Sequence, residues 1–441
     1  MTRASAARAW PAAALAALAA LALLAGCGGA PAGHRGVEIR FWAMGHEGEV
    51  VQELVRDFER EHPGVRVAVQ QIPWSAAHEK LLTSFVGDAL PDVTQLGNTW
   101  IAEFTALRAL APLDRLAASS GLDTSTCFPG VWDTNVIEGV LYGVPWYVDT
   151  RVLFYRRDLL ARAGFPEMPG SWAEWRRAME AVKRTAGPNR FAILLPANEF
   201  APLVALALET GSPLLADDGT RGAFSEPEFR RALDFYAGLF RDRLAPPVTN
   251  NEIANLYQEF ARGYFAMYIT GPWNLDEFRA RMPDSLQSQW ATAPLPGPDG
   301  PESSASLAGG SSLVLSRKSK HPREAWALVE FLLRPESQLR FYRLSGDLPA
   351  RLEAWRDPAL AAEPRVRAFG EQLRRVKPTP KVPEWELIAN RLQEHAEGIV
   401  RGAATPEAAA AALDREANRI LEKRRWLLSR RHAGDAAAES R

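Results

Sequence analysis

The stretch that decides the fold lies near the middle of the chain, at residues 139–160, and reads GVLYGVPWYVDTRVLFYRRDLL. Its second half, residues 148–155, is rich in β-branched and aromatic residues, which is typical of a strand. Aromatic and hydrogen-bonding side chains stand close together in it: Trp146, Tyr147, Asp149 and Arg151. In ligand sites, rings supply flat apolar contact and a few polar groups fix the orientation. The stretch therefore indicates either a ligand site or a buried strand with an aromatic plug.

The same stretch contains G-x-Y-G-x-P, then an aromatic residue two positions before an aspartate, then Y-R-R-D-L. The residues concerned are Gly139, Tyr142, Gly143, Pro145, Tyr147, Asp149, Tyr155, Arg156, Arg157, Asp158 and Leu159. This pattern resembles the hinge-proximal segment of extracellular solute-binding proteins of ATP-driven sugar importers, the family that includes maltose- and trehalose-binding proteins. The resemblance extends from Val37 to about Leu421.

A chain of 441 residues is too long for one compact core and suggests two or more domains. The resemblance implies an α/β, type II periplasmic-binding-protein fold, in which each lobe is a mixed sheet flanked by helices. The expected N-terminal lobe comprises residues 37–147 and 306–353, and the C-terminal lobe residues 148–305 and 354–428. Crossing segments near Val148, Ser304 and Ala354 would form a hinge, and such lobes close around a ligand. Residues 429–441 are expected to be a disordered tail.

The first 26 residues have the features of a signal peptide. Arg3 and Arg8 precede an uncharged Ala/Leu run at residues 10–25, which is shorter than the roughly 20 residues that a membrane span needs. The ending Leu-Ala-Gly-Cys resembles a bacterial lipobox, which implies that Cys27 is lipidated and becomes the first residue of the mature protein. Residues 27–36 would then be a flexible tether. The expected location is the cell envelope, with the protein secreted across the cytoplasmic membrane and anchored by lipid.

Composition excludes several classes of function. Charged residues are 24% of the chain and the formal net charge is −1, so nucleic acid is not an expected partner. Cys127 is the other cysteine and is expected to be a buried or loop thiol rather than a nucleophile. Metal-ligand spacings, phosphate loops and hydrolase motifs are not found, so we expect no metal and no cofactor.

The first strands place candidate ligand contacts at their carboxyl ends. Residues 37–42 alternate as a strand does, residues 50–58 have helical spacing, and residues 65–69 alternate again, which demands a parallel sheet. In open α/β sheets, ligands bind beyond the carboxyl ends of the strands. Glu47 and Trp74 follow two such ends and are candidates. Glu47 could equally be a solvated residue favoured by a helix start.

Two polar candidates follow the third expected strand, which starts at the sequence Pro-Asp-Val of residues 91–93. The resemblance implies that a polar residue at the position of Asn98 touches the sugar, which makes Gln95 and Asn98 candidates. Asn98 could instead be a helix N-cap.

The remaining candidates follow later strands. Trp273 stands in a Gly-Pro-Trp-Asn turn after an apolar strand, where an indole could stack on the apolar C–H face of a pyranose. The glycine pair 309–310 matches a Gly-Gly pair in the family, and Gly310 would let backbone N–H groups approach a ligand. Several relatives have an aromatic residue next, whereas this chain has Ser311, which leaves the exact sugar open. Tyr147 and Asp149 complete the expected set.

The sequence thus predicts a monomeric binding protein that captures a di- or oligosaccharide and delivers it to the permease of an ABC transporter. Two alternatives stay open. The first is a receptor of the same fold for a non-sugar solute, and the second is an enzyme acting on glycosides. The enzyme would need a pair of carboxylates with opposed roles, and no sequence pattern pairs two of them.

Overall fold

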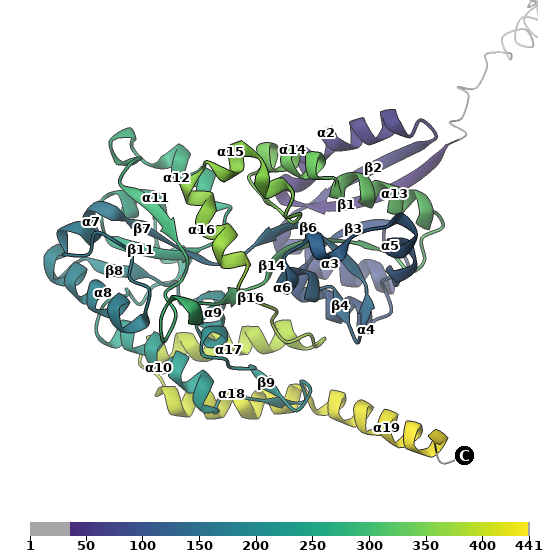
Figure 1. Cartoon of the computed structure of the whole chain (residues 1–441). Coiled ribbons are helices and arrows are strands. Elements are labelled where there is room, and N and C mark those ends of the chain that lie inside the picture. Colours follow the sequence, from purple (N-terminus) through teal and green to yellow (C-terminus); the bar gives the residue numbers. More distant parts are fainter. Residues whose placement is uncertain (1–35, 440–441) are drawn as a thin grey trace, which may run out of the picture.

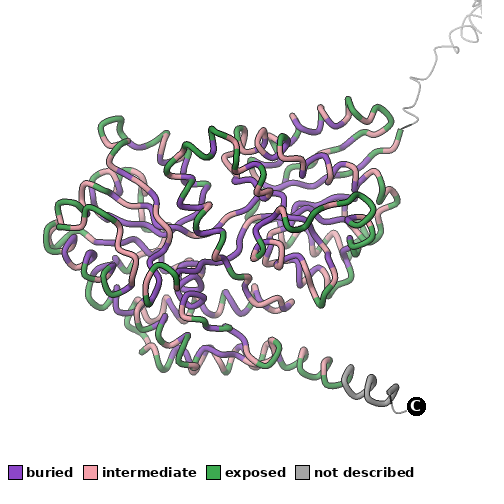
Figure 2. The backbone as a smooth tube through the Cα atoms, viewed as in Figure 1, coloured by how far each residue is buried: buried purple, intermediate pink, exposed green. Residues whose placement is uncertain are grey.

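The computed structural model describes residues 36–439, which form two α/β lobes side by side (Figure 1). The expected signal peptide, Cys27 and nearly all of the expected tether lie outside the described residues. Buried segments follow the sheets of both lobes and the strands that connect them (Figure 2). The mixed α/β fold class expected from the sequence is confirmed.

The N-terminal lobe is built on a six-stranded sheet with the order β15-β6-β14-β3-β1-β2. Strands β2 and β3 both pair in parallel with β1, as the strand–helix–strand pattern predicted. Strand β14 is antiparallel to β3 and β6, and β15 is antiparallel to β6. The strands are β1 (Val37–Met44), β2 (Val65–Ile72), β3 (Val93–Gly97), β6 (Gly143–Asp149), β14 (Gly309–Leu315) and β15 (Leu348–Pro349).

Helices follow the strands of this lobe almost without a loop. Helix α2 (Gly45–Glu61) begins at the residue after β1, and Gly45 at this junction adopts a positive φ of 50°. The other helices are α3 (Trp74–Val86), α4 (Ile101–Ala106), α5 (Asp114–Ser120), α6 (Pro129–Asp133), α13 (Pro322–Leu333) and α14 (Pro335–Ser345). A short hairpin is formed by β4 (Val136–Ile137) and β5 (Val140–Leu141).

Residues 139–160 contribute to both lobes. Strand β6 belongs to the six-stranded sheet, and β7 (Val152–Arg156) belongs to the sheet of the C-terminal lobe. Only Thr150 and Arg151 separate them. Pro145 lies inside β6, next to a register shift between β6 and β14 that leaves Trp146 without a partner.

The C-terminal lobe has a four-stranded sheet with the order β12-β7-β11-β8. Its strands are β7, β8 (Phe191–Leu194), β11 (Phe265–Thr270) and β12 (Trp290–Ala293). Its helices are α7 (Arg157–Arg162), α8 (Trp172–Ala186), α9 (Ala201–Glu209), α10 (Pro227–Arg241), α11 (Leu256–Ala261), α12 (Asn274–Arg281), α15 (Pro358–Ala361), α16 (Pro364–Leu373), α17 (Trp385–Val400) and α18 (Pro406–Ile420). A second hairpin is formed by β9 (Leu215–Ala216) and β10 (Arg221–Gly222).

Helix α8 illustrates how the local sequence determines the packing of this lobe. The Ser171 hydroxyl accepts a hydrogen bond from the Glu174 N–H at 3.3 Å, the cap typical of a serine followed three residues later by a glutamate. The helix then buries Trp172 and Trp175 in the main core cluster. Cys127 is buried as a free thiol, and burial raises its pKa to about 11, so it is a poor nucleophile at neutral pH.

The chain passes between the lobes at three places. The first is the Thr150–Arg151 step between β6 and β7. The second joins β13 (Ser306–Leu307), which pairs with β16 (Val376–Lys377), to β14 of the six-stranded sheet. The third leads from β15 to the short helix η7 (Ala354–Arg356). The crossings expected from the sequence lay near Val148, Ser304 and Ala354.

The C-terminal residues differ from the expectation of a disordered tail. Helix α19 (Glu422–Glu439) continues from α18 and extends away from the body of the molecule (Figure 1). The charged and alanine-rich composition of residues 429–439 suggested disorder, but the same residues have good helix propensity. Within the described part of the chain, no helix combines the length and apolar character that a membrane crossing requires.

Candidate functional site

A cleft of about 800 Å³ lies between the two lobes, within the size range of small-ligand sites. On the N-terminal side it is lined by residues at the carboxyl ends of β1, β2 and β3, which is where open α/β sheets bind ligands. On the other side it is lined by residues at the starts of α9 and α12. Seven of the eight predicted contacts line it: Glu47, Trp74, Asn98, Tyr147, Asp149, Trp273 and Gly310.

Two exposed tryptophans lie on opposite sides of this cleft. Trp74 is the first residue of α3 and is 38% exposed, and Trp273 precedes α12 and is 47% exposed. Large apolar side chains rarely remain this exposed without a function when they line a concave site. The Trp74 ring also contacts Trp100, with centroids 5.9 Å apart. The cleft therefore offers aromatic faces from both lobes.

Glu47 is held in place by two donors rather than being a solvated helix-start residue. Its Oε1 accepts hydrogen bonds from the Tyr147 hydroxyl at 2.8 Å and from the Trp74 indole N–H at 3.2 Å. Its side chain is buried, so the carboxylate has a fixed orientation. The preference of acidic residues for helix starts does not by itself explain these two hydrogen bonds to Glu47.

Gln95 does not line the cleft, contrary to its prediction as a ligand contact. Its side chain is fully buried behind Tyr147: its Oε1 accepts from the Met44 N–H at 2.7 Å, and its Nε2 donates to the Tyr147 hydroxyl at 3.2 Å and to Ser311 Oγ at 3.3 Å. These bonds satisfy both ends of the amide. Gln95 thus holds the Tyr147 hydroxyl in place from the buried side.

Asn98 lines the cleft, but its side chain is occupied by the protein. Its amide donates to the Gly309 carbonyl at 3.0 Å and accepts from the Ser312 hydroxyl at 2.9 Å. It lies in η2 (Asn98–Trp100) and makes no capping hydrogen bond there. The N-cap alternative is therefore wrong, and Asn98 links the end of β3 to β14.

The Asp149 carboxylate and Arg151 form an ion pair at the crossing between the lobes. Arg151 Nη1 lies 3.0 Å from Asp149 Oδ1, and the guanidinium lies over the Trp273 ring, 4.5 Å from its centroid. Burial raises the pKa of Asp149, and the nearby Arg151 opposes that shift. The pair connects the crossing segment to the exposed tryptophan of the C-terminal lobe.

Trp273 is placed by the tight turn that precedes α12. A Cβ at Gly271 would come within 2.0 Å of the Trp273 ring, so only glycine lets the ring lie over this backbone. Asn274 fixes the end of the turn, because its amide donates to Thr270 Oγ1 at 2.8 Å and accepts from the Tyr257 hydroxyl at 2.9 Å.

Gly310 lines the cleft, and close packing against β6 explains why this residue is a glycine. Its φ is 108°, a conformation that L side chains rarely adopt, and a Cβ there would meet the Tyr147 carbonyl oxygen at 2.3 Å. The neighbouring Gly309 is equally close to Asp149. The glycine pair thus allows β14 to lie tightly against β6 at the hinge.

Several lining residues were not predicted from the sequence. They are His46, Gly97, Thr99, Trp100, Arg151, Phe200, Ala201, Pro272, Asp276, Glu277, Leu307, Gly309, Leu344, Ser345, Gly346 and Asp347. Trp100 could have been found, because it ends the same Gln-Leu-Gly-Asn-Thr-Trp run that suggested Asn98. Asp347 could not, because it lies in a loop whose sequence has no distinguishing pattern.

The lining is rich in carboxyl groups. Carboxylates come from Glu47, Asp149, Asp276, Glu277 and Asp347, against the single guanidinium of Arg151 and the imidazole of His46. Burial, followed by the charge of Glu47, raises the pKa of the Asp347 carboxyl well above its ordinary value. Burial likewise raises the pKa of Tyr147. Asp149, Asp276 and Glu277 are ion-paired with Arg151, Arg279 and Arg281, so the negative excess of the lining is small, while its carboxyl oxygens offer many acceptors to hydroxyl donors.

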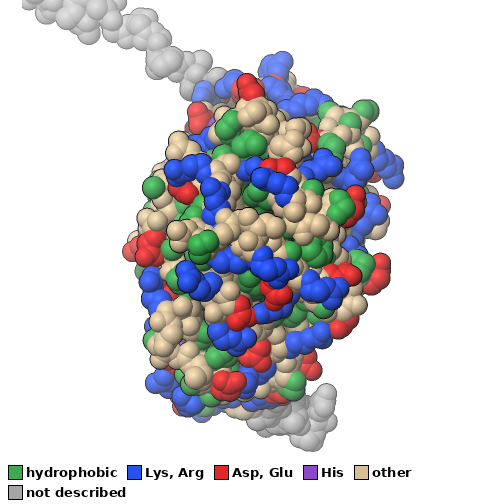
Figure 3. All heavy atoms as spheres, turned by 90° about the vertical axis from the view of Figure 1, so that its left-hand side faces the viewer, with side chains coloured by type: hydrophobic (Ala, Val, Ile, Leu, Met, Phe, Trp, Pro, Cys, Tyr) green, Lys and Arg blue, Asp and Glu red, His purple; other side chains and the backbone are tan. Residues whose placement is uncertain are grey.

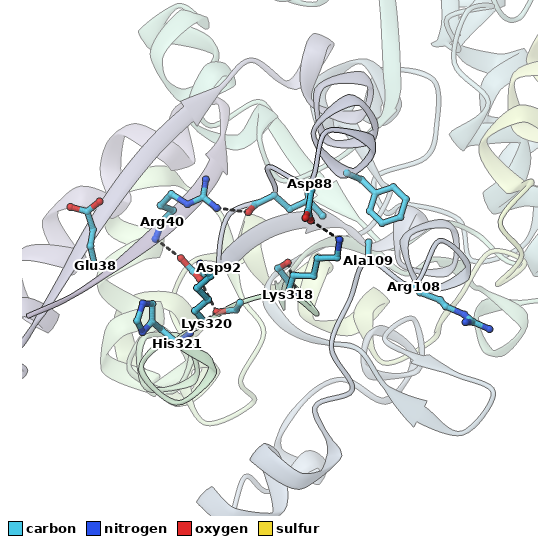
Figure 4. Close-up of a pocket in the computed structure, with 13 residues that line it drawn as sticks. Glu38, Arg40, Asp88, Asp92, Arg108, Ala109, Lys318, Lys320 and His321 are labelled. Carbon is cyan, nitrogen blue, oxygen red and sulfur yellow. Dashed lines mark hydrogen bonds and ion pairs between the residues drawn. The ribbon is translucent and has the colours of Figure 1, made fainter.

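A second cavity, of about 490 Å³, lies in the N-terminal lobe (Figure 4). It opens near the start of β1 and of β3, away from the carboxyl ends where ligands are expected. Several of its charged groups are engaged by the protein: Asp92 accepts from the Arg40 backbone N–H at 3.0 Å, and Lys318 pairs with Asp88 at 2.7 Å. We therefore assign it a structural role. Among the described residues, no cluster of His, Cys, Asp and Glu has the makings of a metal site.

The fold and the interlobe cleft together define a protein that binds a solute between two lobes. Residues 45–339 match the model of the family described as bacterial extracellular solute-binding protein, and the chain belongs to this family. Its members are binding proteins of ABC transporters rather than enzymes, so the glycosidase alternative is set aside.

Three known proteins illustrate the similarity. The structure of the sugar-binding protein MalE from Xanthomonas citri is 49% identical, with a TM-score of 0.86 over 89% of this chain and 99% of that one. The diacetylchitobiose binding protein DasA of Streptomyces coelicolor is 25% identical, covering 86% of this chain and 88% of that protein. An uncharacterized lipoprotein of Streptomyces antibioticus is 30% identical, covering 82% of each.

Proposed function

We propose that this protein captures an uncharged di- or oligosaccharide in the interlobe cleft and delivers it to the permease of an ABC transporter. The observation that carries the proposal is the pair of exposed indoles, Trp74 and Trp273, facing one cleft from opposite lobes. Indole faces match the apolar C–H faces of sugar rings, while carboxylates accept hydrogen bonds from sugar hydroxyls. The sugar ligands of the similar proteins support the same class of solute.

The residues proposed to contact the sugar are Glu47, Trp74, Tyr147, Asp149 and Trp273, with Trp100 and Asp347 added from the structure. Gln95 and Asn98 position this set through the hydrogen bonds described above. Gly310 shapes the hinge side of the cleft.

The proposed mechanism of delivery to a transporter is closure of the two lobes about the hinge. A ligand that contacts both lobes binds the closed form better than the open form, and this difference in affinity shifts the population toward closure. The permease would then recognise the altered surface of the closed protein. We propose that the protein acts as a monomer, since a single chain supplies both walls of the cleft.

The same-fold alternative, a receptor for an anionic solute such as a sugar phosphate, is disfavoured by the acidic lining. The only guanidinium in the cleft is paired with Asp149. Binding a phosphate there would require breaking this pair and approaching several carboxylates.

A thermal-shift screen tests the proposal. Neutral di- and oligosaccharides are expected to raise the melting temperature, because a ligand that binds only the folded state stabilises it by RT ln(1 + [L]/Kd). Sugar phosphates and uronates at the same concentrations should leave it unchanged. A shift by the anionic ligands alone would contradict the proposal.

The lipid anchor is tested separately. The relative described as a lipoprotein supports lipidation at Cys27, which would hold the protein at the outer face of the membrane or in the periplasm. The Cys27→Ser variant should appear in the soluble fraction, whereas wild-type protein stays with membranes. A processed variant that remains in the membrane fraction would contradict this assignment.

A further inference from the structure

Helix α19 presents an unusual surface for a protein of this composition. Within its residues 422–430, Lys423, Arg424, Arg425 and Arg430 are basic and only Glu422 is acidic. Elsewhere both signs are interspersed, as the end of the C-terminal lobe shows (Figure 3). The chain as a whole carries a formal net charge of only −1. The positive charge of α19 is therefore a local feature.

The helix also exposes large apolar side chains. Trp426 is 51% exposed and Leu427 is 45% exposed, although neither lies at the cleft. The Arg430 guanidinium lies over the Trp426 ring, 4.3 Å from its centroid. Exposed aromatic and aliphatic groups beside basic ones are typical of helices that lie in a membrane interface.

These groups share one face of the helix. Lys423, Trp426, Leu427 and Arg430 have the spacing i, i+3, i+4, i+7, which places them on one stripe. The side chains beside this stripe hold the helix to the protein: Arg425 donates to the carbonyls of Thr220 and Asn418 at 2.8 and 2.7 Å. The helix is attached to the protein through Arg425 on another side, so the stripe faces outward.

The position of the helix allows a flat surface to reach it. Helix α19 projects from the lower edge of the molecule in Figure 1, whereas the described chain begins at the upper right. Because the helix extends beyond the body, a flat surface can approach its outward face.

From its charge, its exposed apolar side chains and its projection from the body we propose that the outward face of α19 docks on an anionic phospholipid surface. Each basic side chain near such a surface contributes favourably by attraction to acidic headgroups, and Trp426 and Leu427 would enter the headgroup region. The contact would orient the binding protein relative to the membrane. This inference does not depend on which solute occupies the cleft.

Vesicle partitioning tests the proposal with residues 28–441, so that acylation of Cys27 cannot contribute. We expect the protein to sediment with vesicles of phosphatidylglycerol and phosphatidylcholine, to remain free with pure phosphatidylcholine, and to be released by high salt. Replacing Lys423 and Arg430 by glutamine should lower the partition coefficient roughly thirtyfold, the effect of about 1 kcal/mol per basic residue. Trp426→Ala with Leu427→Ala should also lower it.

Arg56→Gln with Arg115→Gln is the matched control, because both arginines are exposed and lie on the N-terminal lobe. This variant should partition like the parent protein. Circular dichroism and ligand-induced thermal shifts should be unchanged in all variants, which separates docking from folding and from solute binding. The proposal is overturned if the parent protein does not bind vesicles that contain phosphatidylglycerol, or if the α19 variants have the same partition coefficient as the parent. It is also overturned if the partition coefficient of the control falls as much as that of the α19 variants.

Discussion

At the scale of single residues, the account depends on Trp273 being a ligand contact and not part of the core. The side chain is 47% exposed over Gly271, so its removal leaves little buried space. Trp273→Ala should weaken sugar binding by about 1–3 kcal/mol, the range for aromatic anchors. Its melting temperature without ligand should stay close to that of wild type. Titration calorimetry and thermal unfolding measure the two effects.

Trp175 is the matched control for this prediction, because its side chain is fully buried in the C-terminal lobe. Trp175→Ala should cost about 3–5 kcal/mol of folding stability. If Trp273→Ala unfolds as easily as Trp175→Ala while its folded fraction binds sugar normally, Trp273 belongs to the core and the site is misassigned.

Gly310 provides a second prediction at this scale. Its φ of 108° and the close Tyr147 carbonyl mean that Gly310→Ala would strain the backbone and push β14 from β6. We expect a loss of at least about 1–3 kcal/mol in the free energy of unfolding. Gly64→Ala is the control, since nothing lies within 4 Å of its Cβ position, and it should change stability by less than about 1 kcal/mol. Equal denaturant midpoints for the two variants would show that Gly310 is not constrained.

The residue scale also shows what the sequence could indicate. Glu47, Trp74 and Asn98 line the cleft, as expected of residues that come within three positions of the end of a strand in a recognisable parallel unit. The role of Gln95 was wrong, because a strand pattern does not reveal that Tyr147, far along the chain, fills the space in front of it. Asp347 was missed for a similar reason: it reaches the cleft only because β15 pairs with β6.

At the scale of elements, the contact between α8 and α9 contains a buried carboxyl group. Glu209, the last residue of α9, accepts a hydrogen bond from the Trp172 indole at 2.8 Å. Burial raises its pKa well above the ordinary value of 4.5. The folded state therefore holds a proton that the unfolded chain releases, and wild-type stability falls as pH rises from the unfolded pKa to the folded pKa.

Glu209→Gln removes this titration while keeping an acceptor for Trp172. The stability of the variant relative to wild type should increase with pH through that window, by up to about 1.4 kcal/mol per pH unit, and then level off. Melting temperatures measured from acid to alkaline pH provide the check. Parallel curves for the two proteins would mean that Glu209 has the same pKa folded and unfolded.

Elements whose structure depends on neighbouring residues can be predicted from the sequence. Strand pairing between distant residues and the structure of the C-terminal segment were harder to predict. The cap of α8 and its two buried tryptophans follow from residues a few positions apart. The division of residues 139–160 between two sheets does not follow from the strand-like pattern, and the crossing expected near Val148 came from the family resemblance instead. The tail was expected to be disordered, yet α19 continues to Glu439.

At the scale of the whole molecule, the central claim is that a neutral sugar closes the two lobes around the interlobe cleft. Three short crossings join the lobes, and a buried cluster around them contains residues of both lobes. A sugar that contacts Trp74 on one side and Trp273 on the other would favour the closed arrangement.

Small-angle X-ray scattering, with and without a saturating neutral oligosaccharide, tests this claim most directly. The account predicts a smaller radius of gyration with the sugar and no change with a sugar phosphate at the same concentration. Trp273→Ala should require more sugar to reach the compact state. Identical scattering curves with and without a sugar that demonstrably binds would contradict closure of the two lobes around the ligand.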